Sequence, residues 1–489
     1  MYVPLVDPPL SPHQADHFAL HKDTTAWGLL WEQGTRKTRT TIDTFCHQYI
    51  EGRINAVVVL APPGVHENWV VEQMVKWVPD DLKKQIRSYV FYTGKAKRKS
   101  EKFPQRQLID HNGLSVLAIT YNGLMTEHGR KLVKQLLKKR RCMLIADEGH
   151  RLCRPKAKWT IRALSMTRYS ESRRVLTGTL LRNGEPFDAY APIKFLDPDF
   201  WSREIDIHDY AAFKNYFGTW VSQELKDGGS YERCVEYKNL DKLQELLKKI
   251  SDRVEMGVVL GEVPKPYPET FHFDMTPQQR RLYDDLRNDY ISFLESGESV
   301  TADMAMTRML RLQQVTCGYV PVDSVTDDPQ PTLWISDKNP RLELLLDRLK
   351  DEQYQSIIFS RFRKDIDWIM EKLGDKAVRY DGKVPHSERG AAQRRFTRGD
   401  AQWLVGNPAL AAEGLNLQNA RSIYFYANSF KLTERTQGIS RAYRSGQKYP
   451  VKVTDFIARK SVDEGIVTKL RKKMEISASI LGDQWRTWL

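Results

Sequence analysis

Two separate stretches of the chain show the same alternation of short apolar runs and helix-like segments. In each stretch, runs rich in valine and isoleucine end at a polar or glycine-containing turn, and a segment with apolar residues at helical spacing follows. This alternation predicts parallel β-sheets that are covered by helices on both faces. We therefore expect an α/β protein with two parallel-sheet lobes.

The apolar runs also indicate where the lobes begin and end. The first stretch has runs at 56–62, 115–121, 142–148 and 174–179, and the second at 356–360, 376–382, 403–407, 422–428 and 453–458. Aromatic-rich and helix-like sequence lies between the two stretches and predicts helical insertions. We expect an N-terminal lobe at 1–196, helical insertions and a linker at 197–335, and a C-terminal lobe at 336–489.

Charge and cysteine usage narrow the class of protein. The chain has 489 residues and a formal net charge of +14, which favours polyanionic partners, nucleic acid first among them. Its longest apolar run is far shorter than the roughly 18 residues of a membrane span, and no basic region precedes an apolar core at the N-terminus. Five dispersed cysteines without a CxxC pair predict neither a disulfide framework nor a zinc site. A reducing compartment fits, such as the cytoplasm, or the nucleus if the source is eukaryotic.

The stretch "WEQGTRKTRT" at 31–40 contains the parts of a phosphate-binding loop at the start of a predicted helix. Such loops bind phosphate through backbone N–H groups and a lysine, while a hydroxyl binds Mg²⁺. Gly34, Thr35, Lys37 and Thr38 are the candidates, with Thr38 on the metal. Arg36 stands where these loops place a second glycine, so we expect a strained backbone or an altered loop path there. We also expect its guanidinium to point to solvent or toward a carboxylate such as Glu32.

The segment "LIADEGH" at 144–150 places two adjacent carboxylates at the end of a buried strand. The carboxyl ends of parallel strands are where ligands bind in open α/β sheets. We expect Asp147 to hold Mg²⁺ and Glu148 to orient or deprotonate the attacking water.

The segment "QGISRAYRSGQ" at 437–447 carries two arginines in the second stretch. Read as one continuous helix, it places Gln437, Arg441 and Arg444 on a single face. Two guanidiniums on one face suit the charge that develops on a γ-phosphate, and in the other lobe they would act only across a cleft.

Together these motifs resemble the Swi/Snf-like ATPases of helicase superfamily two. "SPHQ", "APPGVHENWVVE", "ITYNGL", "DEGHRL" and "LTGTLLRN" follow in the family's order, and so do "MTPQQRRLYDDL", "SIIFSRFRKDIDWI", "ALAAEGLNLQNA" and "QGISRAYRSGQ". The resemblance runs from about Pro12 to Ile457 and implies two RecA-like lobes. The Arg36 substitution, the histidine of "DEGH" and the compact length depart from the pattern, and the length suggests a bacterial or viral enzyme.

The resemblance also implies roles for individual residues. ATP and Mg²⁺ would be the cofactors, with Gln14 on adenine and with Arg36 and Gln437 among the nucleotide-binding residues. Residues that couple the nucleotide state to DNA would be Thr177, Gly178, Thr179 and Gly414, and residues that contact DNA would be Pro63, Thr120, Tyr121, Arg361 and Asn407.

Three functions remain open on the sequence. The leading one is a monomeric DNA-dependent ATPase that translocates on duplex DNA mainly through backbone contacts. The second is a fork-remodelling or strand-separating helicase, in which Trp27, Trp31 or the aromatic segment 213–220 would serve as a separation pin rather than as core. The third is a DNA-binding scaffold with weak or no ATP turnover, which only Arg36 supports.

Overall fold

The computed structural model describes residues 2–5, 7–95, 98–224, 230–261, 265–296, 302–321, 332–411, 415–444 and 446–483. The chain forms two compact units. Unit 1 consists of Met1–Phe217, Tyr237–Gly261 and Ile476–Gln484, and unit 2 of Gly218–Glu236, Glu262–Glu475 and Trp485–Leu489. The chain therefore crosses between the units at places other than the expected boundaries after residues 196 and 335, which stay predictions. No helix among the described residues is long and apolar enough to cross a membrane.

Unit 1 is built on a seven-stranded sheet in the order β3-β4-β2-β5-β6-β1-β9, and every neighbouring pair is parallel. The strands β2, β4 and β5 are buried along their whole length, which explains their uninterrupted apolar sequences. The strands are β1 (Ala26–Leu29), β2 (Ala56–Ala61), β3 (Ile86–Phe91), β4 (Leu114–Thr120), β5 (Cys142–Asp147), β6 (Ser172–Leu176) and β9 (Ser251–Asp252).

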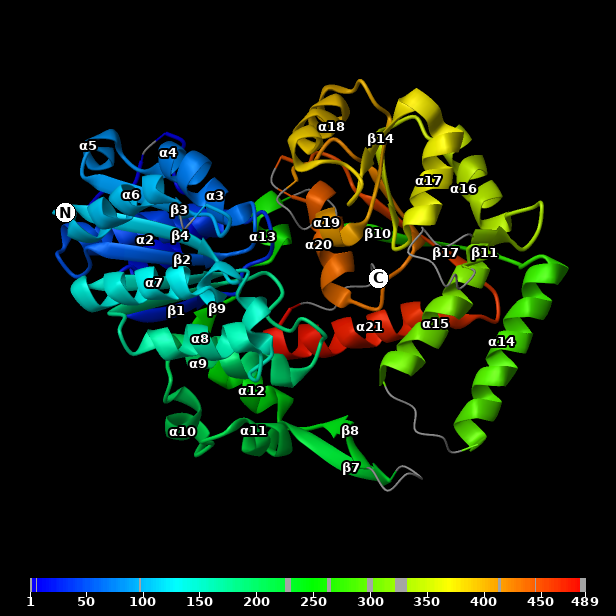
Figure 1. Cartoon of the computed structure of the whole chain (residues 1–489), viewed down its shortest axis with the longest axis horizontal. Helices are drawn as coiled ribbons and strands as arrows, with labels where there is room; N and C mark the ends of the chain where they lie inside the picture. The colour runs from blue at the N-terminus through cyan, green and yellow to red at the C-terminus, as the bar shows by residue number, and fades with distance from the viewer. Residues whose placement is uncertain are drawn as a thin grey trace. The chain divides into compact units, whose positions relative to one another are not determined.

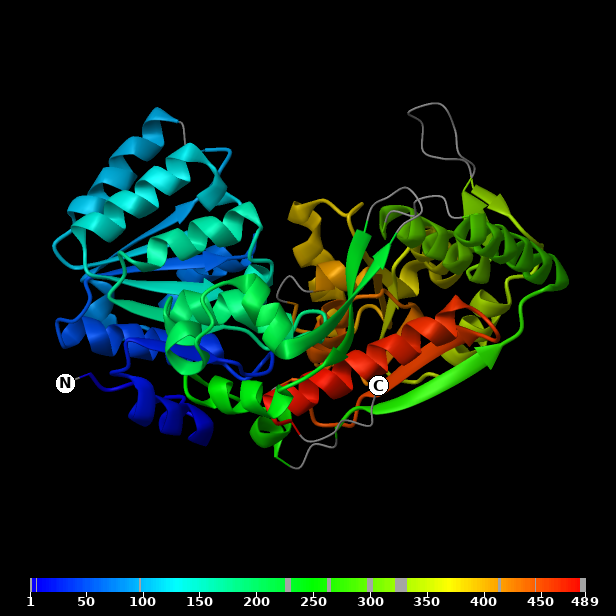
Figure 2. The same cartoon turned by 90° about the horizontal axis from the view of Figure 1, so that it is seen from below.

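Helices cover both faces of this sheet (Figure 2). Helices α3 and α4 are joined by a π-helical turn over Trp69–Gln73. The helices are α1 (Pro12–His21), α2 (Lys37–Ile50), α3 (Val65–Asn68), α4 (Met74–Trp77), α5 (Asp80–Lys83), α6 (Lys99–Asp110), α7 (Glu127–Lys139), α8 (Lys158–Thr167), α9 (Tyr190–Leu196), α10 (Phe200–Ile205), α11 (Tyr210–Phe217), α12 (Leu240–Lys248) and α13 (Met256–Leu260).

Unit 2 is built on a six-stranded sheet in the order β10-β17-β16-β13-β15-β14, again parallel throughout. Two further two-stranded sheets, β7-β8 and β11-β12, were not expected from the helical reading of 197–335. The strands are β7 (Gly218–Glu224), β8 (Ser230–Tyr237), β10 (Tyr267–Phe273), β11 (Tyr319–Pro321), β12 (Thr332–Trp334), β13 (Ser356–Ser360), β14 (Ala377–Tyr380), β15 (Trp403–Gly406), β16 (Ser422–Ala427) and β17 (Lys452–Ala458).

The predicted helical insertion contains α14 and α15, which are among the longer helices of unit 2. These two helices lie side by side (Figure 1). Their inner residues pack with α16 and α17 against one face of the second sheet in a common core. The helices are α14 (Pro277–Ser296), α15 (Ala302–Thr316), α16 (Pro340–Lys350), α17 (Arg363–Leu373), α18 (His386–Arg398), α19 (Pro408–Ala411), α20 (Leu432–Ala442) and α21 (Val462–Leu481). The two parallel sheets with their covering helices confirm the prediction of two RecA-like lobes.

Asp365, at the start of α17, makes the stability of unit 2 depend on pH. It is buried, it accepts a 2.6 Å hydrogen bond from Ser360 Oγ, and burial raises its pKa from 3.8 to about 7. Between pH 4 and 7 the folded state keeps a proton that the unfolded state releases, so rising pH destabilises the fold. We expect Asp365→Asn to become progressively stabilising relative to the wild type across this range, by up to a few kcal/mol above pH 7. Urea denaturation at pH 4.5, 6 and 8 measures this.

Asp367, two residues further on, provides a control of opposite sign. Its carboxylate pairs with Arg379 and Lys383. Although burial acts to raise its pKa, these hydrogen bonds and charges outweigh burial and hold the pKa below its ordinary value. Asp367→Asn should therefore be neutral at low pH and destabilising once the unfolded carboxyl ionises. Equal pH trends for the two variants would contradict the buried-proton explanation.

Candidate active site

The phosphate loop of unit 1 joins β1 to α2, and its backbone is shaped by two residues with positive φ. Gly34 has φ 88° and Arg36, the residue before the first turn of α2, has φ 65°. Left-handed backbone is costly for a residue with a Cβ atom, so the strain expected at Arg36 is present. The Arg36 side chain is exposed, as expected from its place in the loop.

Lys37 begins α2 and folds back over the loop. Its ammonium donates to the carbonyl oxygens of Trp31 and Glu32, each at 2.8 Å. Burial lowers the pKa of Lys37 to about 8, while the nearby carboxylates of Glu148 and Asp147 act to raise it. The structure thus brings the lysine and the two carboxylates into one electrostatic site. Thr38 follows in the same turn and is half-buried.

The acidic pair lies at the carboxyl end of β5, as predicted. Trp69 Nε1 donates to Asp147 Oδ2 at 2.7 Å, and the Glu148 backbone N–H donates to Oδ1 at 2.9 Å. Burial raises the pKa of Asp147 and the Glu148 carboxylate raises it further, whereas the Trp69 hydrogen bond and Lys37 lower it. Glu148 itself has a left-handed backbone with φ 50°, a strained conformation of the kind found at functional sites.

His150 connects this acidic pair to the predicted coupling residues. Its Nδ1 lies 3.2 Å from Glu148 Oε2, 3.1 Å from Thr177 Oγ1 and 3.3 Å from Thr179 Oγ1. Gly178 passes close to the phosphate loop, since a Cβ atom there would lie 3.0 Å from Gln33 N and 3.1 Å from Trp31 O. The structure therefore places Thr177, Gly178 and Thr179 between the acidic pair and the loop.

Gln14 contacts the phosphate loop. Its buried amide donates to Arg36 O at 3.3 Å and to Thr40 Oγ1 at 3.1 Å, and it accepts from Ser11 N at 3.1 Å. In this structure the side chain joins α1 to the loop. Recognition of adenine by Gln14 stays a prediction.

Arg253 is a residue of this site that sequence reasoning missed. Its guanidinium donates to Leu30 O at 2.5 Å and to Gly178 O at 3.3 Å, pairs with Glu32 at 3.3 Å, and forms two bonds to Asp483. It therefore supports the phosphate loop and the coupling segment together. No sequence signal marks it, because its position depends on β9 pairing with β1.

The predicted donor set, Thr38 and Asp147, is of the chemical type that a magnesium ion takes. Mg²⁺ takes oxygen ligands and keeps several waters, so one hydroxyl and one carboxylate beside a phosphate suffice to place it. Thr38 and Asp147 supply these groups, and a carboxylate oxygen that accepts one hydrogen bond keeps a free lone pair. Among the described residues no group of three or more His, Cys, Asp or Glu side chains forms a separate metal cluster.

The residues of unit 1 predicted to contact DNA differ in exposure. Pro63 is exposed. Thr120 is buried with its hydroxyl accepting from Gly123 N at 2.8 Å, and the buried Tyr121 donates its hydroxyl to Asp147 O at 2.8 Å. Tyr121 therefore supports the acidic pair here, and its contact with DNA stays a prediction.

In unit 2, the prediction that Gln437, Arg441 and Arg444 lie on one continuous helix is wrong for Arg444. Helix α20 stops at Ala442, and Tyr443 leaves the helical conformation, so Arg444 lies beyond the helix. The two guanidiniums nevertheless converge, since Nη1 of Arg441 and Nη1 of Arg444 approach Leu415 O at 3.5 and 2.8 Å. Gln437 is buried on the same helix.

Arg361 and Asn407 are also brought together in unit 2. The Asn407 side-chain amide donates to Arg361 O at 3.0 Å, and the Arg361 guanidinium lies over the Phe430 ring at 5.1 Å. Burial lowers the pKa of Arg361. Gly414, the fourth predicted coupling residue, lies outside the described residues.

Three of the six aromatic residues considered for a separation pin belong to the core, while Tyr216 and Trp220 of the segment 213–220 are half-buried. Trp31, Phe213 and Phe217 are fully buried, and Trp31 donates to Asp252 at 2.9 Å. Trp27 is half-buried, bonds the same carboxylate at 2.9 Å and stacks on His21. Four of the five cysteines are buried as well, and all five are free: Cys46, Cys142, Cys153 and Cys317 buried, Cys234 partly exposed.

Two RecA-like sheets, with a phosphate loop before α2 and an acidic pair after β5, define a helicase-like ATPase architecture. The SNF2-related domain family matches residues 17–319, and the helicase conserved C-terminal domain family matches residues 337–446. The chain therefore belongs to the SNF2-related family, the Swi/Snf-like ATPases of helicase superfamily two, which confirms the resemblance seen in its motifs.

Individual relatives are similar along nearly the whole chain. Transcription regulatory protein SNF2 of Saccharomyces cerevisiae is 24% identical over 470 residues, covering 92% of this chain and 26% of the relative. The ISWI chromatin-remodeling complex ATPase ISW1 of the same yeast is 24% identical, covering 95% and 39%. Chromodomain-helicase-DNA-binding protein 1-like of Mus musculus is 26% identical, covering 92% and 47%. The chain thus spans between a quarter and a half of the length of these relatives.

One similar solved structure is the SWI2/SNF2 ATPase core of Sulfolobus solfataricus in complex with dsDNA. It is 20% identical in sequence, with a TM-score of 0.43, and the match covers 96% of this chain and 92% of that one.

Proposed function

We propose that this protein is a Mg²⁺-dependent ATPase that duplex DNA stimulates and that translocates along the duplex. The observation that carries the proposal is the convergence of Lys37, Asp147 and Glu148 in one site of unit 1, linked through His150 to the coupling threonines. A scaffold without turnover would not need this complete set.

Each residue of unit 1 has a defined role in the proposed reaction. Lys37 neutralises the phosphates, Thr38 and Asp147 hold the metal ion, and Glu148 takes the proton of the attacking water. When bound, Mg²⁺ neutralises the charge that develops on the phosphate oxygens. His150 relays a change at Glu148 to Thr177 and Thr179, because its one nitrogen lies within hydrogen-bonding reach of all three side chains.

The arginines of unit 2 complete the proposed mechanism. Arg441 and Arg444 would stabilise the γ-phosphate in the transition state, a role for which paired guanidiniums are suited. Their convergence on Leu415 O supports a joint role even though only Arg441 is helical. On this proposal, hydrolysis requires residues of both units.

DNA as the partner rests on charge and on family membership. The net charge of +14 favours a phosphate backbone, and the names of relatives include DNA-binding and chromatin-remodeling proteins. Monomeric state and location stay predictions. A fork-specific helicase is the second candidate, but burial of Trp31, Phe213 and Phe217 removes three of the six aromatic side chains considered for its pin.

The nucleic-acid preference is tested by ATP turnover with five effectors: none, single-stranded DNA, duplex DNA, a fork and RNA. We expect duplex DNA to give the highest rate, with forks matching duplex of equal length, since backbone tracking is indifferent to the junction. A rate that is highest with forks, or with single strands, would favour the helicase. Equal low rates with all five effectors would refute the proposed function.

A further inference from the structure

The segment "MTPQQRRLYDDL" at 275–286 has no part in the proposed chemistry, yet it opens a chain of buried contacts. Thr276 and Gln279 cap α14 reciprocally, with Gln279 N donating to Thr276 Oγ1 at 3.2 Å and Thr276 N donating to Gln279 Oε1 at 2.9 Å. The Gln279 amide then donates to Val315 O in the last turn of α15 at 3.1 Å, within the buried interior. The beginning of α14 and the end of α15 are thus hydrogen-bonded together.

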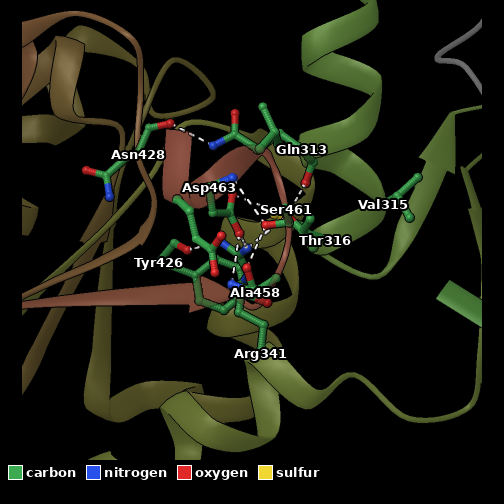
Figure 3. A network of polar contacts seen from close by, with 12 residues as sticks. Gln313, Val315, Thr316, Arg341, Tyr426, Asn428, Ala458, Ser461 and Asp463 are labelled. Carbon is green, nitrogen blue, oxygen red and sulfur yellow. Dashed lines mark hydrogen bonds and ion pairs between the residues drawn. The ribbon is translucent and has the colours of Figure 1, made fainter. Parts of the chain in front are cut away.

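The end of α15 is in turn bonded to the end of β16. Gln313 is fully buried, and its amide donates to Asn428 O at 2.8 Å (Figure 3). One turn away, Thr316 accepts from Arg341 at 2.8 Å, and the same guanidinium donates to Tyr426 O and pairs with Asp463. Figure 3 shows these contacts around the carboxyl ends of β16 and β17.

Asn428 continues the chain of contacts to α20. Its side-chain oxygen accepts from Arg435 Nη1 at 2.7 Å, and its amide donates to Asp455 Oδ1 at 2.7 Å. Arg435 and Asp455 form a buried ion pair at 2.7 Å. Arg435 lies on α20, the helix that also carries Gln437 and Arg441.

Because the residues in this chain of contacts are buried, their hydrogen bonds have few alternative arrangements. Buried donors and acceptors are costly to leave unpaired, and buried polar networks have few alternative arrangements. Residues that are distant along the sequence but joined in this way restrict one another's positions. The α14–α15 pair and α20 are therefore linked through Gln313 and Asn428, within one compact unit.

We propose that Gln313 is a positioning residue for ATP hydrolysis, which through Asn428 and Arg435 holds α20 where Gln437 and Arg441 act. The inference rests on the proposed function, because it assigns α20 a role in hydrolysis. It also gives the insertion a role, since a change in the α14–α15 pair alters turnover without touching nucleotide.

Positioning and simple structural support differ in what they change. An arginine that acts on charge in the transition state contributes to kcat, so misplacing it lowers kcat while the KM for ATP stays nearly constant. Loss of structural support lowers the unfolding midpoint and leaves the kcat of the folded fraction unchanged. The two explanations are therefore separable in the full-length protein.

The test uses Gln313→Met, Asn428→Ala and the double variant, with Gln278→Met as the control. Methionine keeps the volume of Gln313 and removes its amide, whose one side-chain hydrogen bond among the described residues is that to Asn428. Gln278 is an exposed glutamine in the first turn of α14, so its substitution should change nothing. DNA-stimulated kcat, the KM for ATP and the thermal midpoint are measured for each, with amide hydrogen exchange of α20.

We expect each single variant to lower kcat about threefold or more and the double variant to lose less than the product of the single losses, as residues in one network do. Exchange in α20 should rise in Gln313→Met even if its turnover is too low to analyse. An unchanged kcat or unchanged exchange in Gln313→Met, or single losses that multiply, would overturn the inference.

Arg441→Ala separates this inference from the function on which it rests. If Arg441→Ala lowers turnover and Gln313→Met does not, the positioning role alone is wrong. If Arg441→Ala leaves DNA-stimulated turnover intact, α20 has no part in hydrolysis, and both this inference and that part of the proposed function are wrong.

Discussion

Replacing Lys37 by alanine should abolish ATP turnover, whereas replacing Arg36 by glycine should preserve or raise it. Lys37 provides the charge in the phosphate loop, and removing one such preorganised group costs a factor of about a hundred to a thousand. Arg36 is exposed and has a left-handed backbone at φ 65°, which glycine adopts without strain. Steady-state ATP turnover with saturating duplex DNA measures both variants.

The adjacent substitutions control for each other, because both alter the same loop. Thermal unfolding confirms that each variant is folded, since the Lys37 ammonium also bonds two loop carbonyls. If Arg36→Gly is inactive while still folded, the arginine takes part in the reaction and the loop has been misinterpreted. Full activity in Lys37→Ala would place the nucleotide elsewhere.

Glu148→Gln should retain ATP binding and lose hydrolysis. The amide matches the carboxylate in shape but cannot take a proton from water, and a positioned general base contributes about a hundredfold to ten-thousandfold. We expect DNA-stimulated turnover to fall by at least a hundredfold, with nucleotide affinity little changed. Turnover is measured beside equilibrium binding of a fluorescent nucleotide.

Glu171→Gln is the matched control for this variant, because Glu171 is an exposed glutamate immediately before β6 in the same unit. It should behave as the wild type. Unchanged turnover in Glu148→Gln would show that Glu148 is not the base, and a parallel loss of nucleotide binding would assign it to binding instead.

The strands that the sequence predicts best are the buried central ones. Strands such as β2 and β5 are buried on both faces and therefore read as unbroken apolar runs. The strands β1, β3, β9 and β10 escaped prediction for a physical reason. Those at the sheet edges are partly exposed and interrupted by polar residues, β1 is buried only in its second half, and the two residues of β9 pair through tertiary contact.

In the site, too, the residues at the ends of central strands were predictable and those placed by tertiary contacts were not. Lys37 and Asp147 are 110 residues apart, and their proximity follows from the rule that parallel strands end at a common edge. Helix endings were less predictable, since α20 stops at Ala442, before Arg444. The role of Arg253 depends on the pairing of β9 with β1, and that of Trp69 on the contact of its helical turn with the end of β5, which no local pattern specifies.

The bonds between Arg253 and Asp483 have a consequence for the order in which the protein is made. Unit 1 draws on residues before 218 and after 475, so its last contact joins side chains 230 positions apart. A ribosome needs on the order of ten to fifty seconds to add that many residues. The nucleotide-binding lobe therefore cannot reach its final structure as an independent N-terminal domain during synthesis. Unit 1 stays incomplete until nearly all of unit 2 has been translated.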